Sequence, residues 1–259
     1  MEDFDTSRPN IARVYDYWLG GKDNFAADRD LAEKISAINP LVADMARANR
    51  AFVVAAVTRA AEAGVTQFLD LGAGLPTHPS TDEVAREVNP SARVAYVDND
   101  AMVVTHAHAL LASRPGVAAA AADVADSAAV LADPAVRQMI DPDHPVCVIM
   151  ACVLHFFDAA KAQAVTEAYR DWASAGSWIA TSVVHIASER MRALPSSDYT
   201  AGTFINHGER DMTGWLAGWD VIPPGIGEAR RWASRIGGVP SSSSADSYVL
   251  CGAARKPGA

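Results

Sequence analysis

From residue 65 onward, short apolar runs alternate with longer stretches in which apolar residues recur every three or four positions. Short apolar runs are typical of buried strands, and the periodic stretches are typical of amphipathic helices. Strands that alternate with helices favour a mainly parallel sheet covered by helices on both faces. We therefore predict an α/β fold with a seven-stranded, mostly parallel sheet, in which the last two strands form an antiparallel hairpin. The predicted strands are "VTQFLDLGAG", "ARVAYVDND", "GVAAAAADV", "HPVCVIMACVL", "SWIATSVVH", "WDVIPPG" and "SYVLCGAARK".

The residues before the first strand are predicted to be helical, in segments 8–19, 26–38 and 41–63. At 259 residues the chain suits one hydrophobic core with appended pieces rather than two equal domains. We therefore predict an N-terminal helical arm or lid, residues 1–40, followed by a single domain, residues 41–259. The helices between the strands are predicted over residues 80–88, 101–113, 127–139, 159–175 and 209–217.

Composition narrows the choice of partners. The net charge is −9, from 22 Lys and Arg against 31 Asp and Glu, which disfavours nucleic acid as a partner. No apolar run approaches the roughly 20 residues that a membrane span requires. The acidic N-terminus "MEDFDTSRPN" does not resemble a secretion signal, so we expect a cytoplasmic protein. The three cysteines lack the spacing of metal ligands, so no metal site is predicted. The expected partner is a small molecule, and the oligomeric state stays open.

The stretch "QFLDLGAGLPT" is the first candidate for a binding site. In an open parallel sheet, ligands bind beyond the carboxyl ends of the strands, commonly at the first strand–turn–helix unit. Gly72 and Gly74 lack side chains, so backbone N–H groups there can approach a ligand closely. Asp70 ends the strand with a carboxylate. The pattern departs from the GxGxxG of dinucleotide-binding proteins, because Thr77 stands at its last position, and a plain connecting turn is the alternative.

Acidic residues also follow the second and third strands. Asp98 follows the glycine turn by roughly 20 to 30 residues, the spacing at which an acidic residue binds the ribose in folds of this kind. Its carboxylate can accept hydrogen bonds from both ribose hydroxyls. Asp100 directly precedes a helix and fits a helix cap better. Asp123 and Val124 end the third strand, where they can meet an adenine amine and ring nitrogen; a capping role is the alternative.

These motifs occur in the order found in the S-adenosylmethionine-dependent methyltransferases of the Rossmann-like class. The opening "RPNIARVYDYWLGGKDNFAADR" closely resembles a bacterial family labelled S-adenosyl methyltransferase, and the similarity covers nearly the whole chain. The resemblance implies a Rossmann-like sheet and S-adenosylmethionine as cofactor. Pro76 departs from the class pattern, where a third glycine is common. The predicted cofactor-binding residues are Tyr15, Lys22, Asn24, Asp70, Gly72, Gly74, Asp98, Asn99, Asp123, Val124 and Ala151.

The segment "WLGGKDN" holds more polar residues than a helix–helix turn requires. We interpret it as a cover over the cofactor, in which Lys22 meets the methionine carboxylate and Asn24 binds nearby. Tyr15 and Trp18 would screen the site from water. The alternative is a hairpin between two helices whose aromatic residues belong to the core.

His155 follows the fourth strand, on the acceptor side in this class, and is the candidate general base. The alternative is a packed, hydrogen-bonded core histidine. The favoured function is methyl transfer to the oxygen or nitrogen of a small molecule. A non-catalytic sensor that binds S-adenosylmethionine or S-adenosylhomocysteine is the main alternative, and a nicotinamide-dependent oxidoreductase is less favoured.

Overall fold

One mixed sheet forms the centre of the protein. The computed structural model describes residues 5–111, 114–188, 204–233 and 247–258. The strands are β1 (Gln67–Leu71), β2 (Arg93–Asp98), β3 (Val117–Ala121), β4 (Val146–Ala151), β5 (Trp178–Ile186), β6 (Asp220–Val221), β7 (Gly227–Glu228) and β8 (Ser247–Arg255). They form an eight-stranded sheet in the order β3-β2-β1-β4-β5-β8-β6, with β7 also paired to β8. The first five strands pair in parallel, and β8 is antiparallel to its neighbours.

The predicted α/β fold is confirmed, with two local corrections. The sheet has an eighth strand, β7, which consists of two residues and is too short to be recognised from a pattern of apolar residues. The predicted helix over residues 127–139 is two helices, because Asp133 precedes Pro134 and adopts an extended conformation. The Asp133 side chain then accepts a hydrogen bond from the Ala135 amide at 2.8 Å and caps the second helix.

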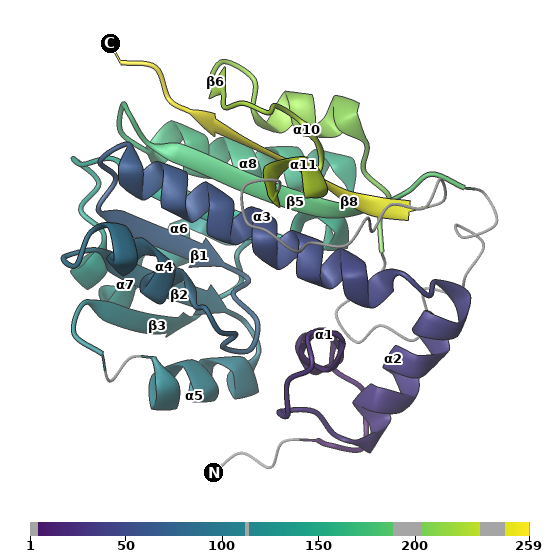
Figure 1. Cartoon of the computed structure of the whole chain (residues 1–259). Helices are drawn as coiled ribbons and strands as arrows, with labels where there is room; N and C mark the ends of the chain where they lie inside the picture. Colours follow the sequence, from purple (N-terminus) through teal and green to yellow (C-terminus); the bar gives the residue numbers. More distant parts are fainter. Residues whose placement is uncertain (1–4, 112–113, 189–203, 234–246, 259) are drawn as a thin grey trace.

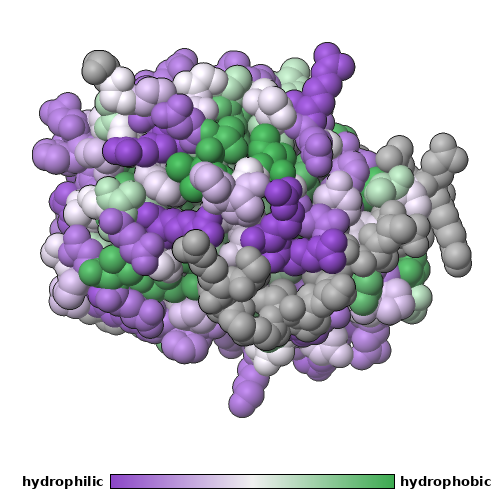
Figure 2. All heavy atoms as spheres, turned by 45° about the horizontal axis from the view of Figure 1, so that its top comes forward, coloured by the Kyte–Doolittle hydropathy of each residue, from purple (hydrophilic) through white to green (hydrophobic). Residues whose placement is uncertain are grey.

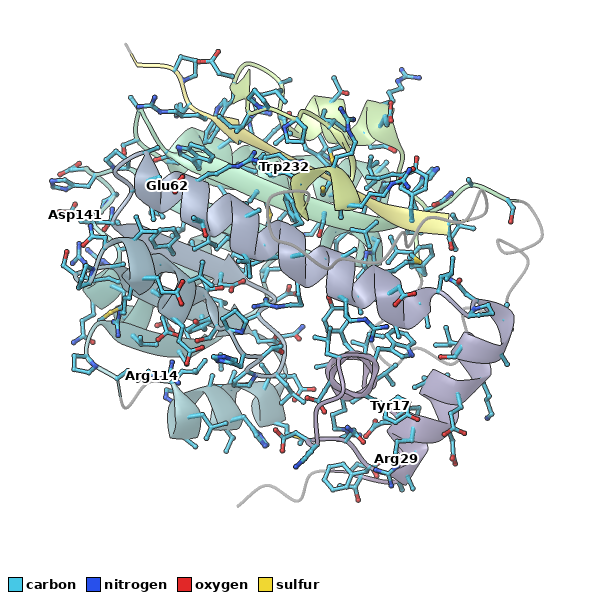
Figure 3. The ribbon with its side chains drawn as sticks, viewed as in Figure 1. Tyr17, Arg29, Glu62, Arg114, Asp141 and Trp232 are labelled. Atoms are coloured by element: carbon cyan, nitrogen blue, oxygen red, sulfur yellow. The ribbon has the colours of Figure 1, made fainter. Side chains whose placement is uncertain are left out.

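Helices cover both faces of the sheet (Figure 1). They are α1 (Ile11–Trp18), α2 (Ala26–Ile38), α3 (Val42–Glu62), α4 (Thr81–Val88), α5 (Ala101–Leu110), α6 (Ser127–Ala132), α7 (Pro134–Met139), η1 (Leu154–Phe156), α8 (Ala159–Trp172), α10 (Glu209–Trp215) and α11 (Arg230–Ala233). One core layer joins the sheet to α3, α4 and α11, and the other joins it to α6, α7, α8 and α10. Trp232 of α11 lies against α3 (Figure 3), with its ring 5.2 Å from that of Phe52.

Helices α1 and α2 stand apart from these two layers. They share a small core with the start of α3, formed by Val14, Trp18, Leu31, Ala32 and Ala46. Figure 1 shows α1 beyond the tips of the parallel strands, beneath the first half of α3. The N-terminal helices therefore lie at the carboxyl edge of the sheet, where ligands bind in folds of this kind.

One face of the surface combines polar and apolar areas. Figure 2 shows hydrophilic residues over most of one face, interrupted by small hydrophobic patches. In the part of the chain that the structure describes, no helix combines the length and the apolar character that crossing a membrane demands.

Candidate functional site

A cavity of about 920 Å³ lies between the carboxyl edge of the sheet and α1. Most of the predicted site residues line it: Tyr15, Asp70, Gly72, Gly74, Asp98, Asn99, Asp123, Val124, Ala151 and His155. Lys22 and Asn24 are not among its lining residues. The cavity is within the size range of ligand pockets, and it is closed on one side by the N-terminal arm.

The glycine turn has the backbone that its sequence predicts. Gly72 and Gly74 have φ angles of +66° and +64°, in the left-handed region that favours glycine. A Cβ atom on Gly72 would lie 2.3 Å from Cγ2 of Val153, whereas one on Gly74 would meet no atom within 4 Å. Gly72 is therefore required by packing as well as by conformation. Gly74 leaves open space in the wall of the cavity.

The Asp98 carboxylate is held against this turn. Its Oδ2 accepts a hydrogen bond from the Gly74 amide at 3.0 Å, and its Oδ1 accepts one from the Asp100 amide at 2.9 Å. Burial raises the pKa of Asp98 above its usual range, and these two backbone donors oppose that rise. Each carboxylate oxygen keeps a further lone pair for a ligand.

The end of the third strand is more open. Asp123 is exposed and its Oδ1 accepts a hydrogen bond from the Ala125 amide at 2.8 Å, so it does cap a turn. Val124 is buried, and its carbonyl accepts a hydrogen bond from the Tyr169 hydroxyl at 3.0 Å. Both residues nevertheless line the cavity, as does the exposed Asn99.

In the "WLGGKDN" segment, Trp18 lines the cavity, whereas the residues after it fold around Asp16. Oδ2 of Asp16 accepts hydrogen bonds from the Asp23 amide at 3.0 Å and from Nδ2 of Asn24 at 2.9 Å. Gly21 has no room for a side chain, because its Cβ would lie 1.9 Å from Oδ1 of Asp16. Asn24 also binds Arg29, which Figure 3 shows at the outer end of the arm. The structure therefore does not bring Lys22 or Asn24 to the cavity.

Tyr15 does reach the cavity, and a polar network fixes its ring. Its hydroxyl donates to the Ala46 carbonyl at 3.1 Å and accepts from Nδ2 of Asn49 at 2.9 Å. Oδ1 of Asn49 accepts from the Ser182 hydroxyl at 2.5 Å, and Ser182 accepts from the Cys152 amide at 3.1 Å. Cys152 follows β4 and has a φ of +58°. The arm is thereby joined to the ends of β4 and β5.

His155 lies in the cavity wall but has the environment of a buried, neutral imidazole. It is 5% exposed, and burial together with the neighbouring His207 lowers its pKa to about 3. Its Nδ1 accepts a hydrogen bond from the Val184 amide at 3.4 Å, which leaves the ring proton on Nε2. In this state Nε2 is a hydrogen-bond donor. The role as general base stays a prediction, and the low pKa makes this ring a weak base.

Asn10 and Arg50 are among the cavity residues that were not identified from the sequence. Asn10 caps α1, and its Nδ2 donates to Oδ2 of Asp100, which links the arm to the loop after β2. An asparagine directly before an apolar periodic stretch is a recognisable signal for a helix cap. The hydrogen bond from Asn10 to Asp100 could not be recognised from the sequence. Arg50 of α3 lines the cavity near the glycine turn. No spacing rule distinguishes Arg50 from the other arginines of that helix.

Among the described residues, no group of three or more His, Cys, Asp or Glu side chains is placed to hold an ion. The groups that line the cavity suit an adenosine-containing ligand with an amino-acid end. Asp70 lies near the end of β1, Asp98 ends β2 and Asp123 follows β3, while Arg50 lines the same cavity.

Comparison with known proteins identifies a family for the chain. The family model for S-adenosyl methyltransferases matches residues 1–257. A presumed methyltransferase from Thermobifida fusca YX is 37% identical, with a TM-score of 0.87 over 98% of this chain and 97% of that one. A DUF574 family protein from Streptomyces avermitilis MA-4680 is 32% identical, with a TM-score of 0.89 over 98% and 100%.

A more distant likeness shows the fold alone. N-methyltransferase NodS from Bradyrhizobium japonicum WM9, solved with S-adenosylhomocysteine, is 12% identical, with a TM-score of 0.53 over 95% of this chain and 100% of that one. A comparison with curated protein sequences gave no match. Because the family match extends over nearly the whole length, this chain belongs to the S-adenosyl methyltransferase family and is a methyltransferase with a Rossmann-like fold and S-adenosylmethionine as its cofactor.

Proposed function

We propose that this methyltransferase acts on a small molecule, which binds in the same cavity as the cofactor. The observation that carries the proposal is the division of the cavity into two unlike halves. Carboxylates line the half that follows β1, β2 and β3. The described residues of the half beside β4, β5 and β8 are mostly apolar, and they include Phe156, Val184, Phe204 and Val249. A predominantly apolar pocket with few polar groups is typical of small-molecule sites.

The cofactor site is proposed at the polar half. Asp98 would accept hydrogen bonds from the ribose hydroxyls, and Asp123 with Val124 would border the adenine. Asn99 would lie beside the ribose, and Ala151 would border the sulfur end. The open space at Gly74 supports this placement, because the wall of the cavity there has room for a ligand.

The bound cofactor supplies a methyl group already activated on a sulfonium, so the protein's own part is to orient the acceptor and exclude water. The arm excludes water by closing the cavity above the strand ends. His155 would orient the acceptor by donating a hydrogen bond from Nε2. A neutral histidine with a pKa of about 3 is a weak base, which favours a nitrogen or an already ionised oxygen over a neutral hydroxyl as the acceptor atom.

Two measurements test the proposal. Calorimetric titration should show binding of S-adenosylmethionine and S-adenosylhomocysteine but no comparable binding of NAD. Incubation with methyl-labelled cofactor and a library of small aromatic amines, carboxylic acids and phenols should then transfer label to a small molecule. Transfer to protein or nucleic acid instead would contradict the proposed acceptor class. Binding of the cofactor without transfer to any acceptor would support the non-catalytic sensor.

A further inference from the structure

Arg50 is a half-buried cation whose hydrogen bonds are incomplete. It lies in the middle of α3 and lines the cavity beside the glycine turn. Its Nη2 donates to the Pro79 carbonyl at 2.7 Å, while its Nε is buried and has no hydrogen-bond partner among the described residues. A buried N–H donor without a partner is costly, since its lost hydration is not replaced. This arrangement is expected where a ligand completes the site.

The charges around Arg50 indicate what the ligand carries. Arg50 is the only arginine or lysine among the described residues that line the cavity, which also holds the carboxylates of Asp16, Asp70, Asp98, Asp100 and Asp123. An acid-rich cavity with a single cation suits a ligand that is mostly positive and bears one negative group. S-adenosylmethionine has a sulfonium, an ammonium and one carboxylate.

Asp70 also lines the cavity and interacts with the charge of Arg50. Asp70 is 7% exposed and takes a hydrogen bond from the Thr81 hydroxyl at 2.6 Å. Arg50 lowers the pKa of Asp70 through its charge, against the larger effect of burial, which raises it. The two groups therefore interact electrostatically. In the described part of the chain, however, Arg50 donates a hydrogen bond to Pro79 and not to Asp70. A zwitterion placed between them would neutralise both.

We propose that Arg50 binds the carboxylate of the cofactor's methionine end while Asp70 binds its ammonium group. This inference rests on the proposed cofactor site, and it replaces Lys22, which is exposed and outside the cavity lining, as the carboxylate partner. The planar guanidinium can donate two parallel hydrogen bonds to a carboxylate. Arg50 thereby makes the site specific for ligands with an intact α-amino acid.

The test compares two ligands on several variants by isothermal titration. The ligands are S-adenosylhomocysteine and its decarboxylated form, which keeps the amine. Wild-type protein should prefer the carboxylated ligand by roughly 10- to 150-fold, as expected for charged hydrogen bonds to a carboxylate. Arg50→Gln should reduce this preference to about 3-fold or less. Arg50→Lys keeps the charge but cannot donate two parallel hydrogen bonds, so its preference should lie between those of the wild type and Arg50→Gln.

Arg47→Gln is the matched control, because Arg47 lies one turn earlier on α3 and pairs with Asp44 outside the cavity lining. This variant should keep the full preference. If Arg50→Gln weakens both ligands equally and retains the preference, Arg50 only supports the Pro79 loop and the inference is wrong. If wild-type protein binds neither ligand, the proposed cofactor site fails and this inference fails with it. Circular dichroism and thermal unfolding check that each variant is folded.

Discussion

The two glycines of the turn should fail in different ways when each is replaced by alanine. Gly72 and Gly74 have nearly the same positive φ, so both alanines incur a similar conformational cost of about 1–2 kcal/mol. Only the Gly72 Cβ meets an obstacle, at 2.3 Å from Cγ2 of Val153, whose side chain is buried in the core. Overpacking of this kind adds about 1–3 kcal/mol. Gly72→Ala should therefore lower the free energy of unfolding by roughly 2–5 kcal/mol and Gly74→Ala by roughly 1–2 kcal/mol.

Cofactor binding should show the opposite order. The methyl group of Gly74→Ala enters open space in the cavity wall, where the ligand is proposed to lie. In folded protein, Gly74→Ala should therefore weaken S-adenosylhomocysteine binding more than Gly72→Ala does. Urea unfolding measures the first quantity, and isothermal titration at a temperature where both variants are folded measures the second.

A third variant tests the assigned cause of the instability. Combining Gly72→Ala with Val153→Ala removes the colliding atoms, so the double variant should lose less stability than the sum of the two single variants. Equal losses of stability for Gly72→Ala and Gly74→Ala, or strict additivity in the double variant, would refute the steric argument.

Three further predictions follow from the site. Asp98→Ala should weaken S-adenosylhomocysteine binding roughly 10- to 150-fold without unfolding the protein, and unchanged affinity in a titration would place the ribose elsewhere. His155 takes up a proton near pH 6.5 when unfolded but near pH 3 when folded, so stability is lost as the pH falls below about 6.5. Wild-type protein should accordingly lose about 2 kcal/mol more than His155→Gln between about pH 7 and pH 5 in urea titrations, and equal losses would show that His155 is not buried as a neutral ring. Asn10→Ala removes the cap of α1 and the bond to Asp100, at a cost of about 0.5–2 kcal/mol, and should speed tryptic cleavage of the arm; unchanged cleavage would argue against this link.

The sequence by itself determined most of the fold and most of the residues that line the candidate site, because these features depend on local rules. Apolar runs, helical periodicity and turn residues act over a few positions, so the five parallel strands and the helix over residues 26–38 could be recognised directly. The glycine turn and Asp98 could also be predicted, since strand ends of a parallel sheet gather at one edge. The same rules could not detect β7, whose two residues are held by pairing with β8 rather than by their own pattern.

Only the tertiary structure decided which charged groups face the cavity. Lys22 and Asn24 belong to a distinctive segment, yet that segment closes around Asp16, because a short polar turn satisfies the nearest carboxylate. Arg50 belongs to an ordinary helix, and its place beside the glycine turn depends on how α3 crosses the sheet. The protonation of His155 is likewise set by the residues packed around it. The protonation and burial of these side chains depend on neighbours that are distant in the chain. The spacing of residues in the sequence does not reveal those neighbours.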